Sequence, residues 1–125
     1  MAHPLKRLEA LLLVAVGGAV GATLRYLVGG AITGLGGTLA ANALGSVVLG
    51  FLLYEAVYAD LLAEQTQLVF GTGLLSSFTT YSTFAVQTAT ASPPLAVGNV
   101  VANYALGFAG VLVGQRLARR VGGSV

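Results

Sequence analysis

The sequence predicts an all-α integral membrane protein, and three observations lead to this fold class. Only 8% of the 125 residues are charged, against roughly 25% in an ordinary soluble domain, while 56% are hydrophobic. No charged residue lies between Glu64 and Arg116, an interval of 51 residues, or between Arg25 and Glu55, an interval of 29. Because a membrane helix needs about 20 apolar residues, the longer interval can hold two spans and the shorter one can hold one.

One membrane domain covering residues 1–125 is therefore expected, with four transmembrane helices at about 8–28, 38–58, 65–91 and 95–117. The protein would be a multi-pass protein of the cell membrane, surrounded by lipid. Lys6 and Arg7 precede the first apolar run, but the later spans make that run a membrane helix rather than a signal peptide. The chain has no cysteine, which excludes disulfides and thiolate metal sites.

The first two spans carry small residues on one face. Gly17 and Gly21 in the first span are four residues apart, as are Ser46 and Gly50 in the second, where Gly45 adds a third small residue. A four-residue spacing places both members of a pair on a common side of the helix. Small residues allow helix backbones to approach closely in lipid, so both faces are expected to pack against other helices. The glycine-rich stretch 29–37 connects the two spans.

The third span is expected to be broken at its middle. Six of the nine residues 76–84 are Ser or Thr and three of them are β-branched, which is poor material for a helix interior. In lipid, such a break is tolerated only where protein or a water-filled cavity satisfies the freed backbone groups. The turn Ser92-Pro93-Pro94 then leads into the fourth span.

Charge and polarity exclude several classes of function. The single histidine, His3, lies at the N-terminus and the four carboxylates lie near the ends of the spans, so no acid/base site is expected within the membrane and the protein is not expected to be an enzyme. Five of the six basic residues lie near the termini. They are interpreted as topology signals rather than as a nucleic-acid-binding surface.

Neutral polar residues occur inside the spans. Thr38 and Asn42 lie one helical turn apart in the second span, as do Asn99 and Asn103 in the fourth. These side chains can serve as interhelical hydrogen bonds, or they can line a pathway. Amide N–H and hydroxyl groups replace part of the hydration shell of an anion, so a pathway of this kind would suit an anion better than a cation.

Two aromatic residues, Tyr81 and Phe84, lie three residues apart beside the expected break. Aromatic ring edges carry the positive side of the ring quadrupole and can also face an anion. Taken alone, the pair is equally compatible with ordinary packing in the core.

Three segments together resemble the Fluc (CrcB) family of fluoride channels. They are GAVGATLRY at 18–26, GTLAANALG at 37–45, and the stretch 71–84 that begins with GTG and ends with TTYSTF. The resemblance covers all four spans in order. It implies passive efflux of fluoride through two pores in an antiparallel dual-topology dimer. It also implies a structural Na⁺ at the centre of the dimer, which is not transported.

The resemblance assigns roles to individual residues. Asn42 would supply the pore amide, Thr38 a hydroxyl on the same wall, and Phe84 one ring of the family's phenylalanine pair. Asn103 occupies a position that is often polar in the fourth helix. Arg25 matches the basic residue of the vestibule, where a fixed positive charge would raise the local concentration of anions; an arginine at a helix end can also simply extend to the interface.

The same resemblance places the sodium ligands on the main-chain carbonyls of Ser76 and Thr79. Two departures from the family pattern occur nearby. Tyr81 stands where the first phenylalanine of the pair is usual, and Ser76-Ser77 replaces a glycine pair. The tyrosine changes the polarity of the pore, and the serines restrict the backbone angles available at the sodium site.

The charges are distributed unevenly between the two sides. With four spans, one side holds Lys6, Arg7 and the C-terminal arginines, whereas the other holds only Arg25. This imbalance favours a single orientation with the termini inside. We therefore expect that the second subunit is either another copy, in a homodimer, or an oppositely oriented paralogue, in a heterodimer.

Two alternative functions have different requirements. A small multidrug-type cation exporter needs an ionisable carboxylate at membrane depth, and the acid nearest the first span, Glu9, lies at its start. A non-transporting membrane subunit would need only the small helix faces. The broken third span with its flanking aromatics favours a channel.

Overall fold

The computed structural model describes residues 3–59 and 62–122, and their regular secondary structure is all helical, with no strand among them. In chain order the elements are α1 (Pro4–Ala31), α2 (Leu35–Tyr54), the π-helical turn η1 (Glu55–Ala59), α3 (Glu64–Gln67), the π-helical η2 (Leu68–Leu75), α4 (Ser76–Phe78), α5 (Ser82–Thr90) and α6 (Pro93–Gly122). Helices α1 and α6 extend beyond the expected spans at both ends, whereas α2 begins earlier than expected and passes into η1 after Tyr54.

Three continuous helices in the described part of the chain are long and apolar enough to cross a membrane. They are Pro4–Ala31, Leu35–Tyr58 and Pro93–Val121, of 28, 24 and 29 residues. Most of their large apolar side chains are exposed on the surface of the subunit, such as Leu11 at 68% and Phe108 at 72%. Such a surface is suited to lipid or to another subunit rather than to water. The chain is a multi-pass membrane protein.

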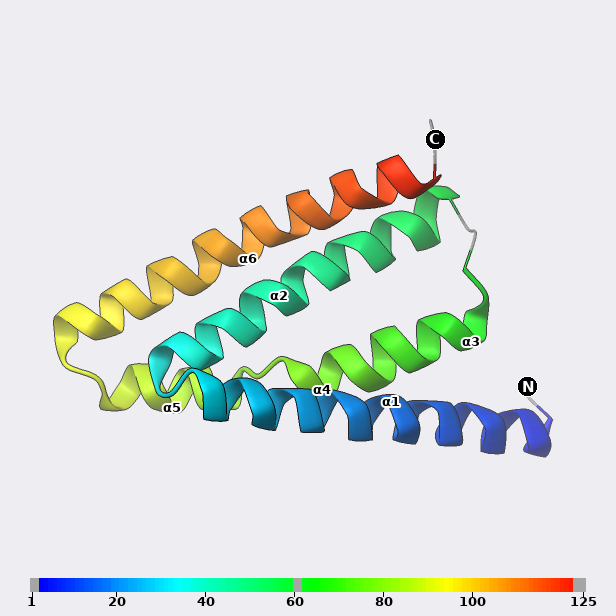
Figure 1. Ribbon diagram of the computed structural model, residues 1–125, viewed down its shortest axis with the longest axis horizontal. Helices are drawn as coiled ribbons and strands as arrows, with labels where there is room; N and C mark the ends of the chain where they lie inside the picture. The colour runs from blue at the N-terminus through cyan, green and yellow to red at the C-terminus, as the bar shows by residue number, and fades with distance from the viewer. Residues whose placement is uncertain (1–2, 60–61, 123–125) are drawn as a thin grey trace.

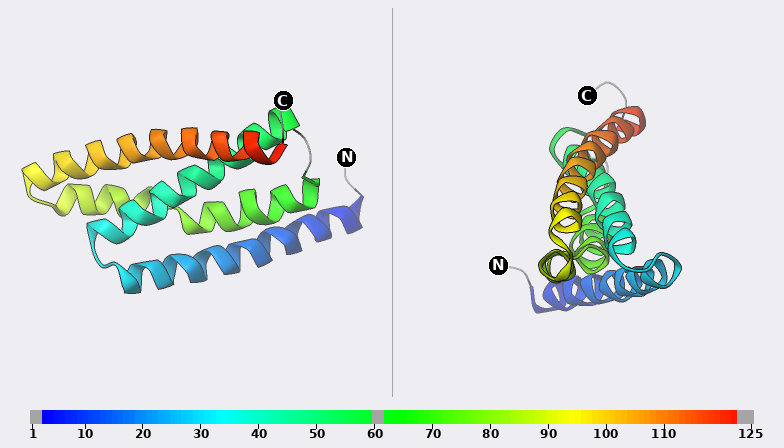
Figure 2. Two further views of the ribbon diagram at one scale, coloured as in Figure 1. Left: turned by 45° about the horizontal axis from the view of Figure 1, so that its top comes forward. Right: turned by 90° about the vertical axis from the view of Figure 1, so that its left-hand side faces the viewer.

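The helices form two layers (Figure 1). Helix α6 lies along α2, and α1 lies along the segment formed by α3, η2 and α4. Helix α1 begins and α6 ends at the same end of the molecule, while the connections from α1 to α2 and from α5 to α6 lie at the other end (Figures 1 and 2).

Glycines hold both layers together. A Cβ built on Gly114 of α6 would overlap the carbonyl oxygen of Val47 in α2, and one on Gly50 of α2 would overlap the carbonyl oxygen of Val111. In the other layer, Gly17 of α1 lies against the backbone of Val69. Backbones this close gain dispersion contacts without a hydrophobic driving force, which is how helices associate in lipid. The expectation that the glycine faces pack against other helices is confirmed.

The helical path of the third segment stops between Phe78 and Ser82. Thr79 has an extended backbone (φ −84°, ψ 159°), and residues 79–81 belong to no helix. The backbone N–H and C=O groups of these residues need hydrogen-bond partners outside a helix, because lipid hydrocarbon offers none.

Candidate functional site

The non-helical backbone at Thr80 is paired with the side chain of Asn42. The Thr80 N–H donates to Asn42 Oδ1 at 2.8 Å, and Asn42 Nδ2 donates to the Thr80 carbonyl oxygen at 2.9 Å. One primary amide thus satisfies both main-chain groups of the same residue, as a neighbouring strand would in a sheet. Asn42 holds the opening between α4 and α5 against the middle of α2.

A chain of side-chain amides continues from Asn42 into α6. Asn42 Nδ2 also lies 3.5 Å from Asn103 Oδ1, Asn103 Nδ2 donates to Asn99 Oδ1 at 3.0 Å, and Asn99 Nδ2 donates to Thr88 Oγ1 at 2.9 Å. Asn99 is buried, with 7% of its surface exposed. The structure therefore joins the two polar stripes that the sequence places on separate helices, through one long contact between Asn42 and Asn103.

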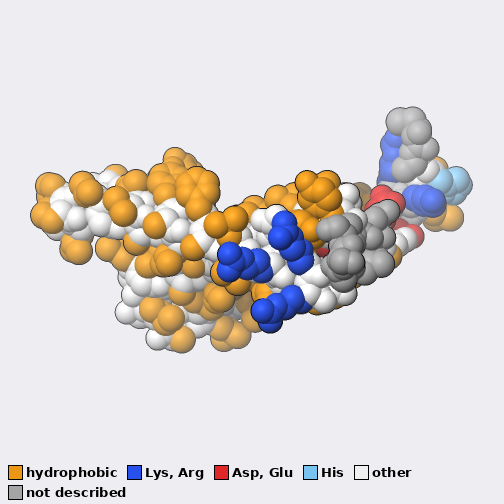
Figure 3. Space-filling view, turned by 90° about the horizontal axis from the view of Figure 1, so that it is seen from above, with side chains coloured by type: hydrophobic (Ala, Val, Ile, Leu, Met, Phe, Trp, Pro, Cys, Tyr) orange, Lys and Arg blue, Asp and Glu red, His pale blue; other side chains and the backbone are white. Residues whose placement is uncertain are grey.

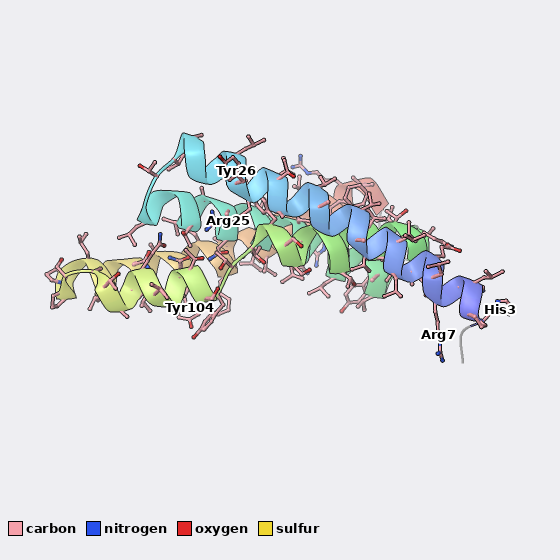
Figure 4. The ribbon with its side chains drawn as sticks, turned by 90° about the horizontal axis from the view of Figure 1, so that it is seen from below. His3, Arg7, Arg25, Tyr26 and Tyr104 are labelled. Carbon is pink, nitrogen blue, oxygen red and sulfur yellow. The ribbon has the colours of Figure 1, made fainter. Side chains whose placement is uncertain are left out.

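Aromatic rings lie beside this chain. The Tyr81 and Phe84 ring centroids are 5.8 Å apart, and Tyr104 of α6, labelled in Figure 4, meets Phe84 edge to face at 6.3 Å. Phe84 is 8% exposed, whereas Tyr81 is 73% exposed. Phe84 is therefore already in contact within the subunit, and the Tyr81 ring is available to a neighbouring molecule.

Arg25 reaches from α1 to the beginning of α2. Its Nη2 donates to Thr38 Oγ1 at 3.3 Å, and Thr38 is only 2% exposed. Figure 4 shows Arg25 at this end of the two helices. The guanidinium thus lies next to the residue that precedes Asn42 by one turn, which places a positive charge at one end of the polar stripe of α2.

A groove on the surface of the subunit brings together part of the predicted site. It has a volume of about 370 Å³ and is lined by Asn42, Ser46, Ser76 and Thr79 together with glycines and leucines. Thr38, Phe84 and Asn103 do not line it. The predicted site residues therefore divide into two groups that meet at Asn42.

The main-chain carbonyls of Ser76 and Thr79 are left without helical partners. The amide that would donate to Ser76 O is Thr80 N–H, which donates to Asn42 instead; the amide for Thr79 O is Thr83 N–H, which donates to Thr80 Oγ1 at 3.2 Å. The Thr79 hydroxyl donates back to Leu75 O at 3.0 Å, and the Ser76 hydroxyl donates to Thr72 O. In this segment the carbonyl oxygens of Ser76 and Thr79, rather than the two hydroxyls, thus lack a helical hydrogen bond. Among the described residues no group of three or more His, Cys, Asp or Glu could hold a metal.

Comparison of the sequence with known proteins identifies the family of the chain. The family model described as CrcB-like protein, Camphor Resistance (CrcB), matches residues 12–115. The chain belongs to the CrcB family.

Curated relatives of this CrcB chain carry consistent names. It is 53% identical over 121 residues to "Fluoride-specific ion channel FluC 1" of Haloarcula marismortui, covering 97% of this chain and 94% of the relative. It is 62% identical over 107 residues to "Fluoride-specific ion channel FluC 2" of Halobacterium salinarum, covering 85% and 84%. A bacterial relative, "Fluoride-specific ion channel FluC" of Thermotoga maritima, is 40% identical over 118 residues, covering 86% and 93%.

Sequence reasoning does not find two members of the polar network in this CrcB chain. The break is expected to free the main chain of Thr80, but the sequence does not indicate that Asn42 holds it. Asn99 is identified as part of the polar stripe of the fourth span, whereas Thr88 is not identified. The only signal that could have indicated Thr88 is its four-residue spacing from Phe84. The Thr88 hydroxyl donates to the Phe84 carbonyl oxygen at 2.8 Å.

Proposed function

We propose that this CrcB chain is a fluoride-specific ion channel that lets fluoride leave the cell passively and so lowers cytoplasmic fluoride. The observation that carries the proposal is the near full-length identity to relatives named as fluoride-specific channels. The geometry supports the proposal, because the amide chain and the rings beside it are neutral. They can donate to an anion without a fixed positive charge that would bind the anion too tightly to release it.

The fluoride pathway in this proposal follows Thr38, Asn42, Phe84 and Asn103, with Tyr81 on the exposed side. The long 3.5 Å contact between Asn42 Nδ2 and Asn103 Oδ1 is the weakest link of the amide chain, because it lies at the limit for a hydrogen bond. If a fluoride ion accepts a hydrogen bond from this N–H, the protein loses only the weakest hydrogen bond of the chain. The Asn42 bonds to Thr80 would remain in place and keep the amide oriented.

We also propose that residues 64–90 form a fourth, broken crossing and that two chains pair antiparallel. The support is the groove at Asn42, which carries polar groups on a surface that would otherwise face lipid. The second subunit is either another copy or an oppositely oriented paralogue. The charge imbalance and the numbers 1 and 2 in the relatives' names favour a paralogue in some assemblies.

The residues at the end of α4 fit a structural Na⁺ at the dimer centre. Na⁺ prefers hard oxygen ligands, and the carbonyls of Ser76 and Thr79 are among the oxygens in this region that accept no helical hydrogen bond. Each subunit would contribute its own pair. A cation held there would bind carbonyl oxygens of both broken segments and so hold the two subunits together. It would not enter the fluoride pathway.

A cation exporter needs a carboxylate at membrane depth, and none of the acidic residues that the structure describes lies there. The buried acid of the described residues, Glu55, lies where α2 ends. Its carboxylate accepts hydrogen bonds from Leu62 N at 2.6 Å and Gln67 Nε2 at 2.8 Å. Glu55 therefore fixes the connection to α3 and does not project into the membrane interior.

The proposed function is tested by a flux measurement. The chain is purified alone, reconstituted into liposomes loaded with potassium fluoride, and fluoride release is followed with an ion-selective electrode after valinomycin is added. We expect release of fluoride and none from protein-free liposomes. Release that appears only when a paralogue is co-reconstituted identifies a heterodimer. Chloride release at a similar rate, or no fluoride release under either condition, would contradict the proposal.

Replacement of Arg25 by glutamine is expected to slow fluoride flux in a salt-dependent way. The loss should be roughly threefold near 0.01 M salt, where the Debye length is about 30 Å, and should nearly vanish near 1 M, where it is about 3 Å. Arg25→Lys is the matched control, because it keeps the charge beside Thr38. An Arg25→Lys protein as slow as Arg25→Gln at low salt would show that charge is not the cause.

A further inference from the structure

A second surface feature lies at the opposite end of α2 from Arg25. A groove of about 230 Å³ runs between the end of α2, η1 and α6, and its walls include Leu53, Val57, Val111, Tyr54 and Tyr58. Leu53 and Val57 are 54% and 69% exposed, so the groove opens to the outside of the subunit. Its apolar part lies on the membrane-spanning portion of the helices, and its tyrosines lie at the end where aromatic residues meet the lipid headgroups.

Three arginines follow Gln115, which lines this groove, near the end of α6. Arg116, Arg119 and Arg120 fall within five residues near the end of α6, and Figure 3 shows basic side chains gathered on this face of the molecule. No ion pair joins them to a carboxylate in the part of the chain that the structure describes. This concentration of positive charge therefore has no internal neutralisation there.

Arg119 is held in place by the wall of the groove itself. Its Nε donates to the Tyr54 hydroxyl at 3.2 Å, and its guanidinium carbon lies 5.4 Å from the centroid of the Tyr54 ring. Tyr54 is only 7% exposed, and its ring packs at a tilt of 37° against the ring of Tyr58, with centroids 4.7 Å apart, so it is a rigid support. These contacts use one edge of the guanidinium. The two terminal nitrogens remain, in the fork geometry that binds phosphate through two parallel hydrogen bonds.

We propose that this groove is a binding site for one anionic phospholipid molecule. The phosphate contacts the terminal nitrogens of Arg119, with Arg116 and Arg120 contributing charge, and one acyl chain lies along Leu53, Val57 and Val111. The occupant is a lipid rather than a free anion because the charge stands directly beside an apolar groove at membrane depth. Clusters of basic residues next to a membrane span attract acidic headgroups, and the groove adds a defined place for the chain. This site is independent of the fluoride pathway.

The proposal is tested by native mass spectrometry of the purified protein in detergent, titrated with phosphatidylglycerol or with phosphatidylcholine of the same chain length. We expect one phosphatidylglycerol per subunit to be retained at concentrations about tenfold below those needed for phosphatidylcholine. Arg116→Gln/Arg120→Gln alters two exposed side chains with little risk to folding, and it should weaken retention several-fold. Arg119→Gln should weaken it further.

Two further variants separate this site from general charge attraction. Val57→Trp fills the groove and leaves every arginine in place, so it should lower phosphatidylglycerol retention. Lys6→Gln/Arg7→Gln removes two positive charges at the start of α1, outside the groove, and should leave retention unchanged. Equal retention of the two lipids, an equal loss in the Lys6→Gln/Arg7→Gln protein, full retention in Val57→Trp, or displacement by glycerol phosphate at the same concentration as by the lipid would each overturn the proposal.

Discussion

Replacement of Asn42 by alanine is expected to reduce fluoride flux by at least tenfold, below detection in the liposome assay. The change removes both hydrogen bonds that hold the Thr80 backbone, at 2.8 and 2.9 Å, together with the N–H directed at Asn103. A buried polar group left unpaired costs about 1–3 kcal/mol, so the opening between α4 and α5 will rearrange as well as lose its donor. The measurement is the initial rate of fluoride release at matched protein content.

Two variants distinguish the donor from the support. Asn42→Asp keeps an acceptor for the Thr80 N–H but turns an oxygen towards the Thr80 carbonyl, so it should also abolish flux at neutral pH. Ser46→Ala is the matched control, because the Ser46 hydroxyl donates only to the main-chain oxygen of Asn42, at 2.9 Å, and leaves the amide intact. It should retain most of the flux. A normal rate of fluoride release from the Asn42→Ala protein would show that Asn42 is not part of the fluoride pathway.

Gly114→Ala is expected to have the largest effect on stability. A Cβ at this position overlaps the Val47 carbonyl oxygen and lies 2.7 Å from the Phe51 nitrogen, so α6 must move away from α2. Overpacking of a tight contact typically costs about 1–3 kcal/mol, and here the colliding atoms are backbone that cannot change rotamer. The thermal unfolding midpoint in detergent should fall by several degrees, and the fraction that aggregates on purification should rise.

Gly98→Ala provides the matched comparison on the same helix. Nothing lies within 4 Å of a Cβ built on Gly98, so the substitution adds a methyl group in open space. Because alanine is the better helix former, the midpoint should stay the same or rise slightly. If Gly114→Ala and Gly98→Ala gave the same midpoint, the close approach of α2 and α6 would not be a source of stability.

Several features could be predicted from the sequence because they depend on local composition. The scarcity of charge indicated the membrane class, and the glycine spacing indicated which helix faces pack. The cluster of Ser and Thr residues around Thr79 marked the place where regular helix stops. Each of these follows from residues that are close together in the chain, so no knowledge of the three-dimensional arrangement was needed.

The pairing of side chains across helices could not be predicted from the sequence. Asn42 and Thr80 are 38 residues apart, and Asn42 and Asn103 are 61 apart. An asparagine suits a pore wall and a backbone clamp equally well, because its amide carries both donors and an acceptor. Only the register of α2 against the interrupted segment decides which partners it meets. For the same reason the sequence does not reveal that the ring of Tyr54 is buried beneath Arg119.

The amide chain also has a direction. From Asn103 to Asn99 to Thr88, each donor points towards the connection between α5 and α6, so the bond dipoles add instead of cancelling. One subunit alone would therefore impose an electrical polarity on an ion passing beside it. In an antiparallel pair of identical chains the second chain contributes the opposite polarity, and the assembly as a whole should carry equal current at equal voltages of either sign.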